Sequence, residues 1–167
     1  TIFNRDRSKC KTLEKAGAKV AATPKAAASG MAFVITMVAD PAAVREVALG
    51  DDGLLEGLAQ DAIWIDCSTV GAKESISLAA QTTVRGCKFL EAPVTGSKMP
   101  AESGELTFLV GGPDQLVNEA QPLFDIMGAK TVHVGDYGSA GALKLVLNHL
   151  LGVSMAAFSE GIALGEA

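Results

Sequence analysis

A lysine and an asparagine near the start of a long apolar segment are the residues best suited to chemistry in this chain. Lys144 and Asn148 stand four positions apart, so on a helix both side chains project from one face. A glycine-rich turn at 138–141 precedes them, and most of their neighbours are apolar. An ammonium group is costly to bury unless it is paired or used. Lys144 is therefore either a functional cation or a lysine whose head reaches water along an apolar stem, and this segment alone leaves both open.

Four other segments carry polar groups directly after predicted strands. In a doubly wound sheet, ligands bind beyond the carboxyl ends of the strands, so these groups would share one edge of the sheet. Polar loop residues are common, and each segment alone is weak evidence, whereas their joint placement is stronger. The four segments are Asn4-Arg5, Ala39-Asp40, Cys67-Ser68-Thr69 and Thr95-Gly96-Ser97.

Two of these segments suggest particular ligands. An arginine after the second strand of a dinucleotide-binding fold accommodates the 2′-phosphate of NADP, and Arg5 is placed to do this. A plain surface arginine fits equally well, because no Gly-x-Gly-x-x-Gly loop precedes it. The next residue, Asp6, is expected to cap a helix. The segment Thr95-Gly96-Ser97 offers backbone N–H groups and two hydroxyls that could hold a carboxylate.

The elements that would position these groups alternate between strands and helices. This order predicts an α/β fold with a Rossmann-like, doubly wound and mostly parallel sheet, whose first strand is missing, followed by a long helix. Helices are expected at 7–16, after Thr23 and Asp40, and at 71–85 and 113–127. Strands are expected at 1–3, 19–22, 31–38, 62–66, 88–92, 106–110 and 131–134.

Three segments carry more detailed expectations. The near-continuous apolar run 31–38 predicts a strand buried on both faces. Residues 93–104 are expected to be irregular. From Gly138 to the end the pattern is helical, and polar residues interrupt the apolar run 143–163 before it approaches the roughly 18 residues of a membrane span. We therefore expect that helix to be buried in protein.

Composition excludes several other classes of function. The chain has 167 residues, of which 49% are hydrophobic, and a formal net charge of −5 without a basic stripe, so nucleic acid is not an expected partner. Its three cysteines and two histidines have no ligand-like spacing, which predicts neither a disulfide framework nor a metal site. No membrane association is expected either.

Three segments together carry a family pattern. They are Asp66-Cys67-Ser68-Thr69-Val70, the stretch 91–106 that begins Glu91-Ala92-Pro93-Val94-Thr95-Gly96-Ser97, and the stretch 138–148 that contains Lys144 and Asn148. In order and spacing they resemble the Asp-x-Ser-Thr, substrate-binding and Gly-x-Gly-x-x-x-Lys-x-x-x-Asn segments of the β-hydroxyacid dehydrogenases. The closest resemblance is to the glyoxylate/succinic semialdehyde reductases, and it covers the whole chain.

The resemblance implies an NADPH-dependent reductase of a small aldehyde acid. Lys144 would donate a proton to the carbonyl oxygen as hydride arrives, and Asn148 would position the lysine or the substrate. The substrate carboxylate would be held by the segment Thr95, Gly96 and Ser97. Thr69, Asn4 and Arg5 would bind the NADP cofactor.

The chain departs from the family pattern at a few positions. Thr95 stands where serine is frequent, and Ala140 replaces the second glycine of the catalytic segment. Leu147 stands where the 6-phosphogluconate dehydrogenases have histidine, which argues against a sugar-phosphate acid as substrate. His149 and Arg5 differ from the usual 3-hydroxyisobutyrate dehydrogenase pattern. The alternatives are an NAD-dependent 3-hydroxyisobutyrate-type dehydrogenase and a non-catalytic nucleotide-binding module, against which the presence of Lys144 speaks.

The family pattern also predicts how the chain is organised. Residues 1–136 would form an NADP-binding domain without its first strand and glycine loop, and 137–167 the start of a helical domain. We expect a piece of a longer enzyme, inactive alone, with a homo-oligomer possible. The expected location is intracellular and soluble, in the cytoplasm or in an organelle such as a plastid or mitochondrion.

Overall fold

A six-stranded sheet forms the body of the protein, which we describe from a computed structural model over residues 1–166. The strand order is β1-β2-β3-β5-β4, and β6 pairs with β5. Three of the five pairings are parallel, namely β1 with β2, β2 with β3 and β5 with β6. The predicted Rossmann-like, mostly parallel sheet is confirmed, although β5 runs antiparallel to β3 and β4. The strands are β1 (Phe33–Thr36), β2 (Ile63–Asp66), β3 (Lys88–Glu91), β4 (Val94–Thr95), β5 (Leu106–Gly111) and β6 (Gly128–Gly135).

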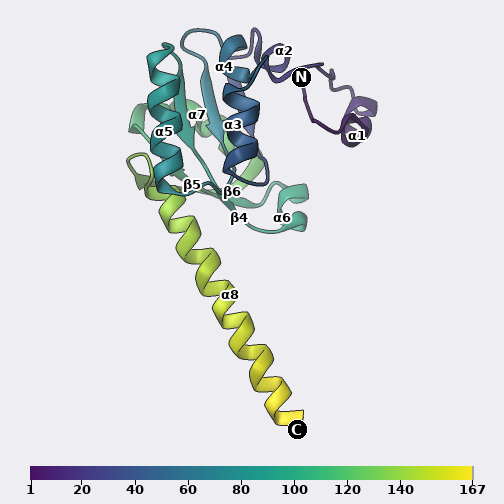
Figure 1. The fold of residues 1–167 in the computed structure, drawn as a ribbon, viewed down its shortest axis with the longest axis vertical. Coiled ribbons are helices and arrows are strands. Elements are labelled where there is room, and N and C mark those ends of the chain that lie inside the picture. Colours follow the sequence, from purple (N-terminus) through teal and green to yellow (C-terminus); the bar gives the residue numbers. More distant parts are fainter. Residues whose placement is uncertain (167) are drawn as a thin grey trace.

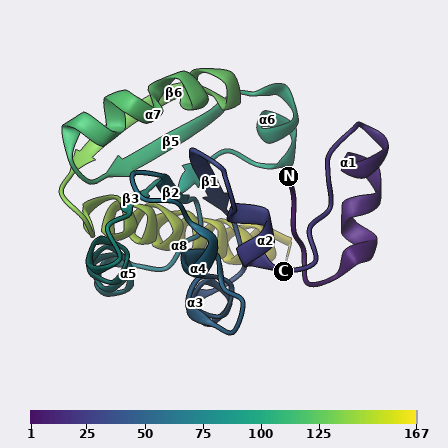
Figure 2. The same ribbon diagram turned by 90° about the horizontal axis from the view of Figure 1, so that it is seen from above.

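Helices cover both faces of this sheet, with α3, α4 and α5 on one side and α7 on the other (Figure 2). Successive side chains of a strand point to opposite faces, so β2 contributes to two cores. Trp64 packs on the α3–α5 side, and Ile63 and Ile65 pack on the α7 side. The helices are η1 (Arg7–Cys10), α1 (Lys11–Lys15), α2 (Pro24–Ala28), α3 (Pro41–Leu49), α4 (Leu54–Gly57), α5 (Ala72–Val84), α6 (Lys98–Ser103), α7 (Asp114–Met127) and α8 (Ser139–Glu166).

Local capping fixes where the early helices begin. The side chain of Asp40 accepts a hydrogen bond from the Ala43 N–H at 2.8 Å, and Pro41 occupies the first helical position of α3. Asp6 caps η1 in the same way, accepting from the Ser8 N–H at 3.0 Å. Both caps were predicted from the sequence, because aspartate at a helix start satisfies an otherwise unpaired N–H.

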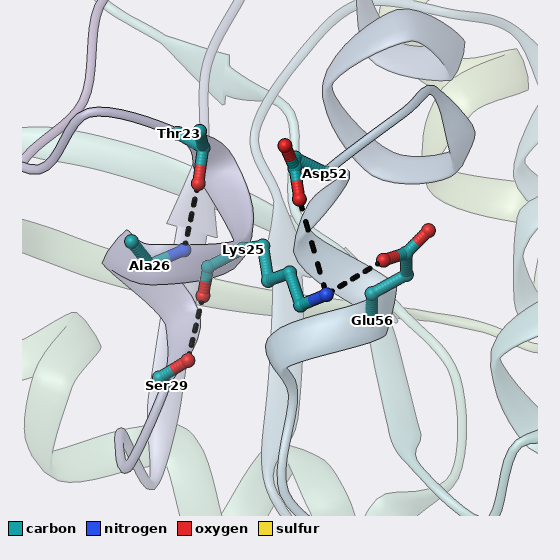
Figure 3. Close-up of polar contacts among 6 residues, drawn as sticks. All are labelled: Thr23, Lys25, Ala26, Ser29, Asp52 and Glu56. Carbon is teal, nitrogen blue, oxygen red and sulfur yellow. Dashed lines mark hydrogen bonds and ion pairs between the residues drawn. The ribbon is translucent and has the colours of Figure 1, made fainter.

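Helices α2 and α4 lie against each other and are joined by polar contacts (Figure 3). Thr23 caps α2 by accepting from the Ala26 N–H at 3.1 Å. Lys25 then reaches Glu56 of α4 at 3.0 Å. Both side chains are open to solvent, so water screens the pair and it adds little to the stability of the fold. Closer packing comes from Gly57, where a Cβ atom would lie only 2.1 Å from the Lys25 carbonyl oxygen.

The expectation that 31–38 is buried on both faces is wrong. The strand is limited to Phe33–Thr36, and Ile35 and Met37 are 42% and 65% exposed. The reason is its place in the sheet: β1 lies at one end of the strand order and pairs only with β2. This edge position holds for the described chain, which by the family pattern lacks the first strand of the fold.

Two further local expectations need correction. Residues 93–104 are not irregular, because they form β4 and α6, and Gly104 ends α6 in the left-handed conformation. The two short strands expected at 1–3 and 19–22 are reduced to a single bridge between Ile2 and Val20. The segment that bears Arg5 therefore lies beside the sheet with little regular pairing.

The helix α8 leaves the body and extends far from it (Figure 1). Within the described residues only Ala140 and Gly141 of α8 are buried, so the predicted burial of 143–163 in protein is not found inside this chain. By length and composition α8 could also cross a membrane, contrary to the expectation from its polar interruptions. A core helix of a soluble protein passes the same test, so this is weak evidence. Ala167, the last residue of the predicted helical segment, lies outside the described residues.

Candidate active site

A groove of about 300 Å³ lies where the ends of β1 and β2 face the turn after β4 and the first turns of α8. It brings together Thr69, Gly96, Lys144 and Asn148, which come from three distant parts of the chain. Three of the four polar strand ends therefore meet here, because the carboxyl ends of β1 and β2 lie at the same edge. The lining residues are Met37, Val38, Ala39, Cys67, Ser68, Thr69, Val94, Gly96, Lys144 and Asn148.

The helix α8 delivers Lys144 and Asn148 to the groove from successive turns. Lys144 is half-buried and Asn148 is exposed. The apolar surroundings expected of this lysine are present only in part, because Leu145, Val146 and Leu147 are themselves 48%, 54% and 38% exposed. In the described part of the chain no ion pair occupies Lys144, so its ammonium is available to a bound group.

A buried carboxylate orders the strand ends on the opposite side of the groove. Asp66 accepts hydrogen bonds from the Thr36 hydroxyl at 2.7 Å and from the Ser68 hydroxyl at 2.7 Å. The Ser68 hydroxyl oxygen in turn accepts from the Val38 N–H at 3.0 Å. The loop that carries Thr69 is thereby tied to the end of β1. These hydrogen bonds account for a serine at position 68 without a nucleophilic role, because its hydroxyl already bonds Asp66 and the Val38 N–H.

Gly96 presents backbone to the groove for a steric reason. Its φ is +119°, and a Cβ atom there would lie 3.0 Å from Leu106 and 3.2 Å from Pro100. Thr95, beside it, is half-buried and pairs with Thr107 of β5. Ser97 is exposed and precedes α6. Of the three residues predicted to hold a carboxylate, only Gly96 lines the groove.

Asn4 and Arg5 lie apart from the groove. The Arg5 guanidinium donates to Glu46 of α3 at 3.2 Å, and its side chain is 80% exposed. Asn4 accepts from the Asp6 N–H at 2.9 Å and so shapes the turn into η1. In dinucleotide-binding folds the adenosine and nicotinamide ends bind at different strands, so a site for the 2′-phosphate need not lie in the groove.

The structure adds a second buried carboxylate that the sequence reading did not single out. Glu91, at the end of β3, is 2% exposed and accepts from the N–H groups of Gly138 and Ala140 at 2.8 and 2.9 Å. The available signal was an acidic residue inside the apolar strand 88–92. Ala140 has no positive φ, so it fits the helix start although the family pattern places glycine there.

Burial raises the pKa of two groups beside the groove, Asp66 and Cys67. It raises the pKa of Asp66 above its usual value, and the nearby charge of Glu91 adds to the rise. It raises the pKa of the Cys67 thiol to about 12, with a smaller contribution from Asp66. Cys67 is therefore a packing residue and not a nucleophile. Among residues 1–166 no group of three or more His, Cys, Asp or Glu is arranged to hold a metal ion.

Comparison with known proteins defines the class. Residues 1–135 match the NAD binding domain of 6-phosphogluconate dehydrogenase, so this chain belongs to the 6-phosphogluconate dehydrogenase-like family of nucleotide-binding oxidoreductases. The resemblance to β-hydroxyacid dehydrogenases that the motifs indicated is thereby confirmed.

Particular relatives are more informative about the branch of the family. The chain is 40% identical over 166 residues to glyoxylate/succinic semialdehyde reductase 2, chloroplastic, of Arabidopsis thaliana, covering 99% of this chain and 46% of that protein. Among solved structures it is similar to 3-hydroxyisobutyrate dehydrogenase of Mycobacterium tuberculosis, with a TM-score of 0.89 and 27% identity over 98% of this chain and 55% of that chain. It is also similar to Psf3 in complex with NADP+ and 2-OPP, with a TM-score of 0.87 and 28% identity over 97% and 59%. The chain thus spans about half the length of the proteins it matches.

Proposed function

We propose that the complete protein reduces a small aldehyde acid, such as glyoxylate or succinic semialdehyde, to the hydroxy acid with NADPH. The observation that carries this proposal is the groove itself, which joins Lys144 and Asn148 of α8 to Thr69 and Gly96 at the sheet edge. Similarity to glyoxylate/succinic semialdehyde reductase 2 over 99% of this chain supports the substrate class.

The residues of the groove suit the reduction of a carbonyl group. The nicotinamide cofactor supplies a hydride when it is bound. Negative charge then grows on the carbonyl oxygen, and the Lys144 ammonium stabilises it and donates a proton to it. Asn148, one turn further along α8, orients Lys144 or the substrate. The backbone of Gly96, with Thr95 and Ser97 beside it, holds the substrate carboxylate.

The residues available for the cofactor fit a dinucleotide with a 2′-phosphate. Thr69 lines the groove at the end of β2, where such folds hold the nicotinamide side. Arg5 has a largely exposed guanidinium whose partner, Glu46, is an exposed carboxylate that a phosphate can displace. Similarity to a solved complex that contains NADP+ supports this assignment.

The same proposal includes the organisation of the complete protein. Residues 1–136 form the NADP-binding domain, and 137–167 begin a helical domain that closes over the substrate. The many exposed apolar side chains of α8 support this, because they are suited to packing against further protein in the same chain or in a second copy. We place the enzyme inside the cell, in the cytoplasm or in an organelle.

The proposal is tested with a panel of aldehyde acids and both nicotinamide cofactors on the protein encoded by the complete gene. Lys144→Ala should lower kcat by about 10²–10⁴-fold, the usual contribution of a general acid. Lys73→Ala, which removes an exposed lysine of α5, serves as the matched control and should leave kcat unchanged. Near-normal turnover by the Lys144 variant would sink the assignment of the catalytic residue.

The cofactor assignment has its own test. Arg5→Asp should raise KM for NADPH relative to NADH by about tenfold or more, because a carboxylate repels the 2′-phosphate and accepts from a ribose hydroxyl. Arg7→Asp, in the exposed helix η1, is the control for a general change of charge. A cofactor ratio that does not move with Arg5→Asp would refute the role given to this arginine.

A second candidate is an NAD-dependent oxidation of a 3-hydroxyisobutyrate-type acid. The similarity to the Mycobacterium tuberculosis 3-hydroxyisobutyrate dehydrogenase favours it, since the two folds agree over 98% of this chain. The same groove and the same Lys144 would serve the reverse reaction, with the lysine accepting the proton. Higher kcat/KM with 3-hydroxyisobutyrate and NAD than with any aldehyde acid and NADPH would replace the first proposal with this one.

A further inference from the structure

The carboxylate of Glu91 connects the sheet to the first turn of α8. Its Oε1 atom accepts hydrogen bonds from the backbone N–H groups of Gly138 and Ala140, which lie 47 and 49 residues later in the chain. The first N–H groups of a helix have no partner within the helix, and they carry its positive partial charge. A carboxylate from β3 therefore satisfies the start of α8 both by hydrogen bonding and by charge.

The surrounding chain is shaped to admit this carboxylate. Gly111 is the register partner of Glu91 in β5, and a Cβ atom there would lie only 2.2 Å from Oε1. On the helix side, a Cβ atom at Gly141 would lie 3.2 Å from Oε2. The carboxylate thus occupies the space of two absent side chains, between the strand and the helix.

Oε2 is buried and has no hydrogen-bond partner among residues 1–166. An unsatisfied acceptor in the interior destabilises the fold, and the hydrogen bonds to Oε1 offset this only in part. Stability is therefore a weak reason for a carboxylate at this place. A stronger reason for the carboxylate is the position of α8. Its hydrogen bonds to the two N–H groups fix where the helix starts and how the helix is rotated about its axis.

The anchored residue and the groove residues lie on one row of α8. Ala140, Lys144 and Asn148 are spaced by four, so they follow one another along the same face. Ala140 is fully buried, and the other two line the groove one and two turns further on. A shift of the first turn is therefore transmitted directly to both groove side chains.

Few other contacts hold this helix in the described part of the chain. Its neighbours in the body are β5, β6 and α5, and a Cβ atom added at Gly71, before α5, would lie 3.1 Å from Leu145. Beyond the first turn its residues are mostly exposed. The anchor at Glu91 is thus the main polar contact between α8 and the sheet.

We infer that Glu91 is a positioning residue for the reaction proposed above: its carboxylate sets the start of α8 and, through it, the place of Lys144 and Asn148 in the groove. Glu91 does not line the groove, so it acts through the helix and not on the substrate. This inference rests on the proposed function for its catalytic consequence. The anchoring of α8 itself is independent of any substrate.

The test compares Glu91→Ala and Glu91→Gln in the complete protein. The alanine variant removes both hydrogen bonds and should lower kcat by about 10–100-fold, with KM for the cofactor within about twofold, because a misplacement near 1 Å can cost that much. Glutamine keeps an oxygen that accepts from the same two N–H groups, so it should restore most of the lost kcat. Glu74→Gln is the matched control, since Glu74 also has a buried unpartnered oxygen but pairs with Arg45 on α3.

A second readout separates this inference from the proposed function. Hydrogen–deuterium exchange of the peptide 138–148 should be faster in Glu91→Ala than in wild type, and close to wild type in Glu91→Gln. If the wild-type protein reduces no aldehyde acid, the proposed function fails while faster exchange still supports the anchor. Folded Glu91→Ala with wild-type exchange would overturn the anchor. Wild-type kcat in this variant, or a glutamine variant as impaired as alanine, would overturn the positioning role.

Discussion

Asp66 and Glu91 are two buried carboxylates that lie next to each other and have different structural roles. They are register partners at the ends of the parallel strands β2 and β3, with exposures of 1% and 2%. Asp66 is bonded by hydroxyl and backbone groups of the neighbouring strand ends, at Thr36 and Ser68. Glu91 is bonded by two backbone amides of a separate helix.

The difference shows how one edge of a sheet can organise both walls of a groove. Asp66 ties together segments that the sheet already holds close, so it refines local geometry around Thr69. Glu91 bonds the first turn of α8, a helix outside the sheet, to the end of β3. The first carboxylate shapes the proposed cofactor side, and the second places the helix that bears the proposed catalytic lysine.

The largest effect should come from filling the space beside Glu91. Gly111→Ala puts a Cβ atom 2.2 Å from Oε1, which forces the carboxylate out of its place. We expect a loss of about 3 kcal/mol in the free energy of unfolding, from overpacking and broken hydrogen bonds. Urea unfolding measures it.

A double-mutant cycle identifies the cause of that loss. In the Glu91→Ala background the same Gly111→Ala change should cost less than about 1 kcal/mol, because the carboxylate is already gone. Equal costs in both backgrounds would show that Gly111 is required for some reason other than Glu91.

An intermediate effect should appear at Asp66, as a dependence of stability on pH. Burial raises the pKa of Asp66, so the folded protein holds this proton more tightly than the unfolded chain does. The resulting stability is complete below the usual pKa of 3.8 and is lost as pH rises through the raised folded value. The stability of wild type relative to Asp66→Asn should therefore fall as pH rises from about 4, by at most about 1.4 kcal/mol per pH unit. Urea unfolding of both proteins across this range checks the sign, and a difference that stays flat or grows would contradict it.

The smallest effect should appear at Tyr137, whose hydroxyl donates to the Phe89 carbonyl oxygen at 2.9 Å. Burial raises the pKa of Tyr137, and the charge of Glu91 raises it further. Glu91→Gln should lower this pKa while leaving it above the usual value of 10, whereas Asp66→Asn should leave it unchanged. Titration of tyrosinate absorbance, with Tyr137→Phe as the blank, measures both. A larger shift with Asp66→Asn than with Glu91→Gln would reverse the assignment of the two carboxylates.

Sequence alone determined the features that depend on short-range pattern. Alternating strands and helices, the caps at Asp6 and Asp40, and the family segments were all readable, because each rests on residues close together in the chain. The pairing of Lys144 with Asn148 was readable for the same reason, as helical periodicity places residues four apart on one face.

The tertiary structure decided what depends on distant neighbours. It reversed the direction of β5 relative to β3 and β4, which an apolar run cannot reveal. It also brought Glu91, an acidic residue in an apolar strand, to a backbone N–H group 47 residues away, so that its carboxylate anchors α8. Hydrophobic pattern specifies which residues are buried in general, whereas the partner of a buried charge is fixed only when the elements pack together.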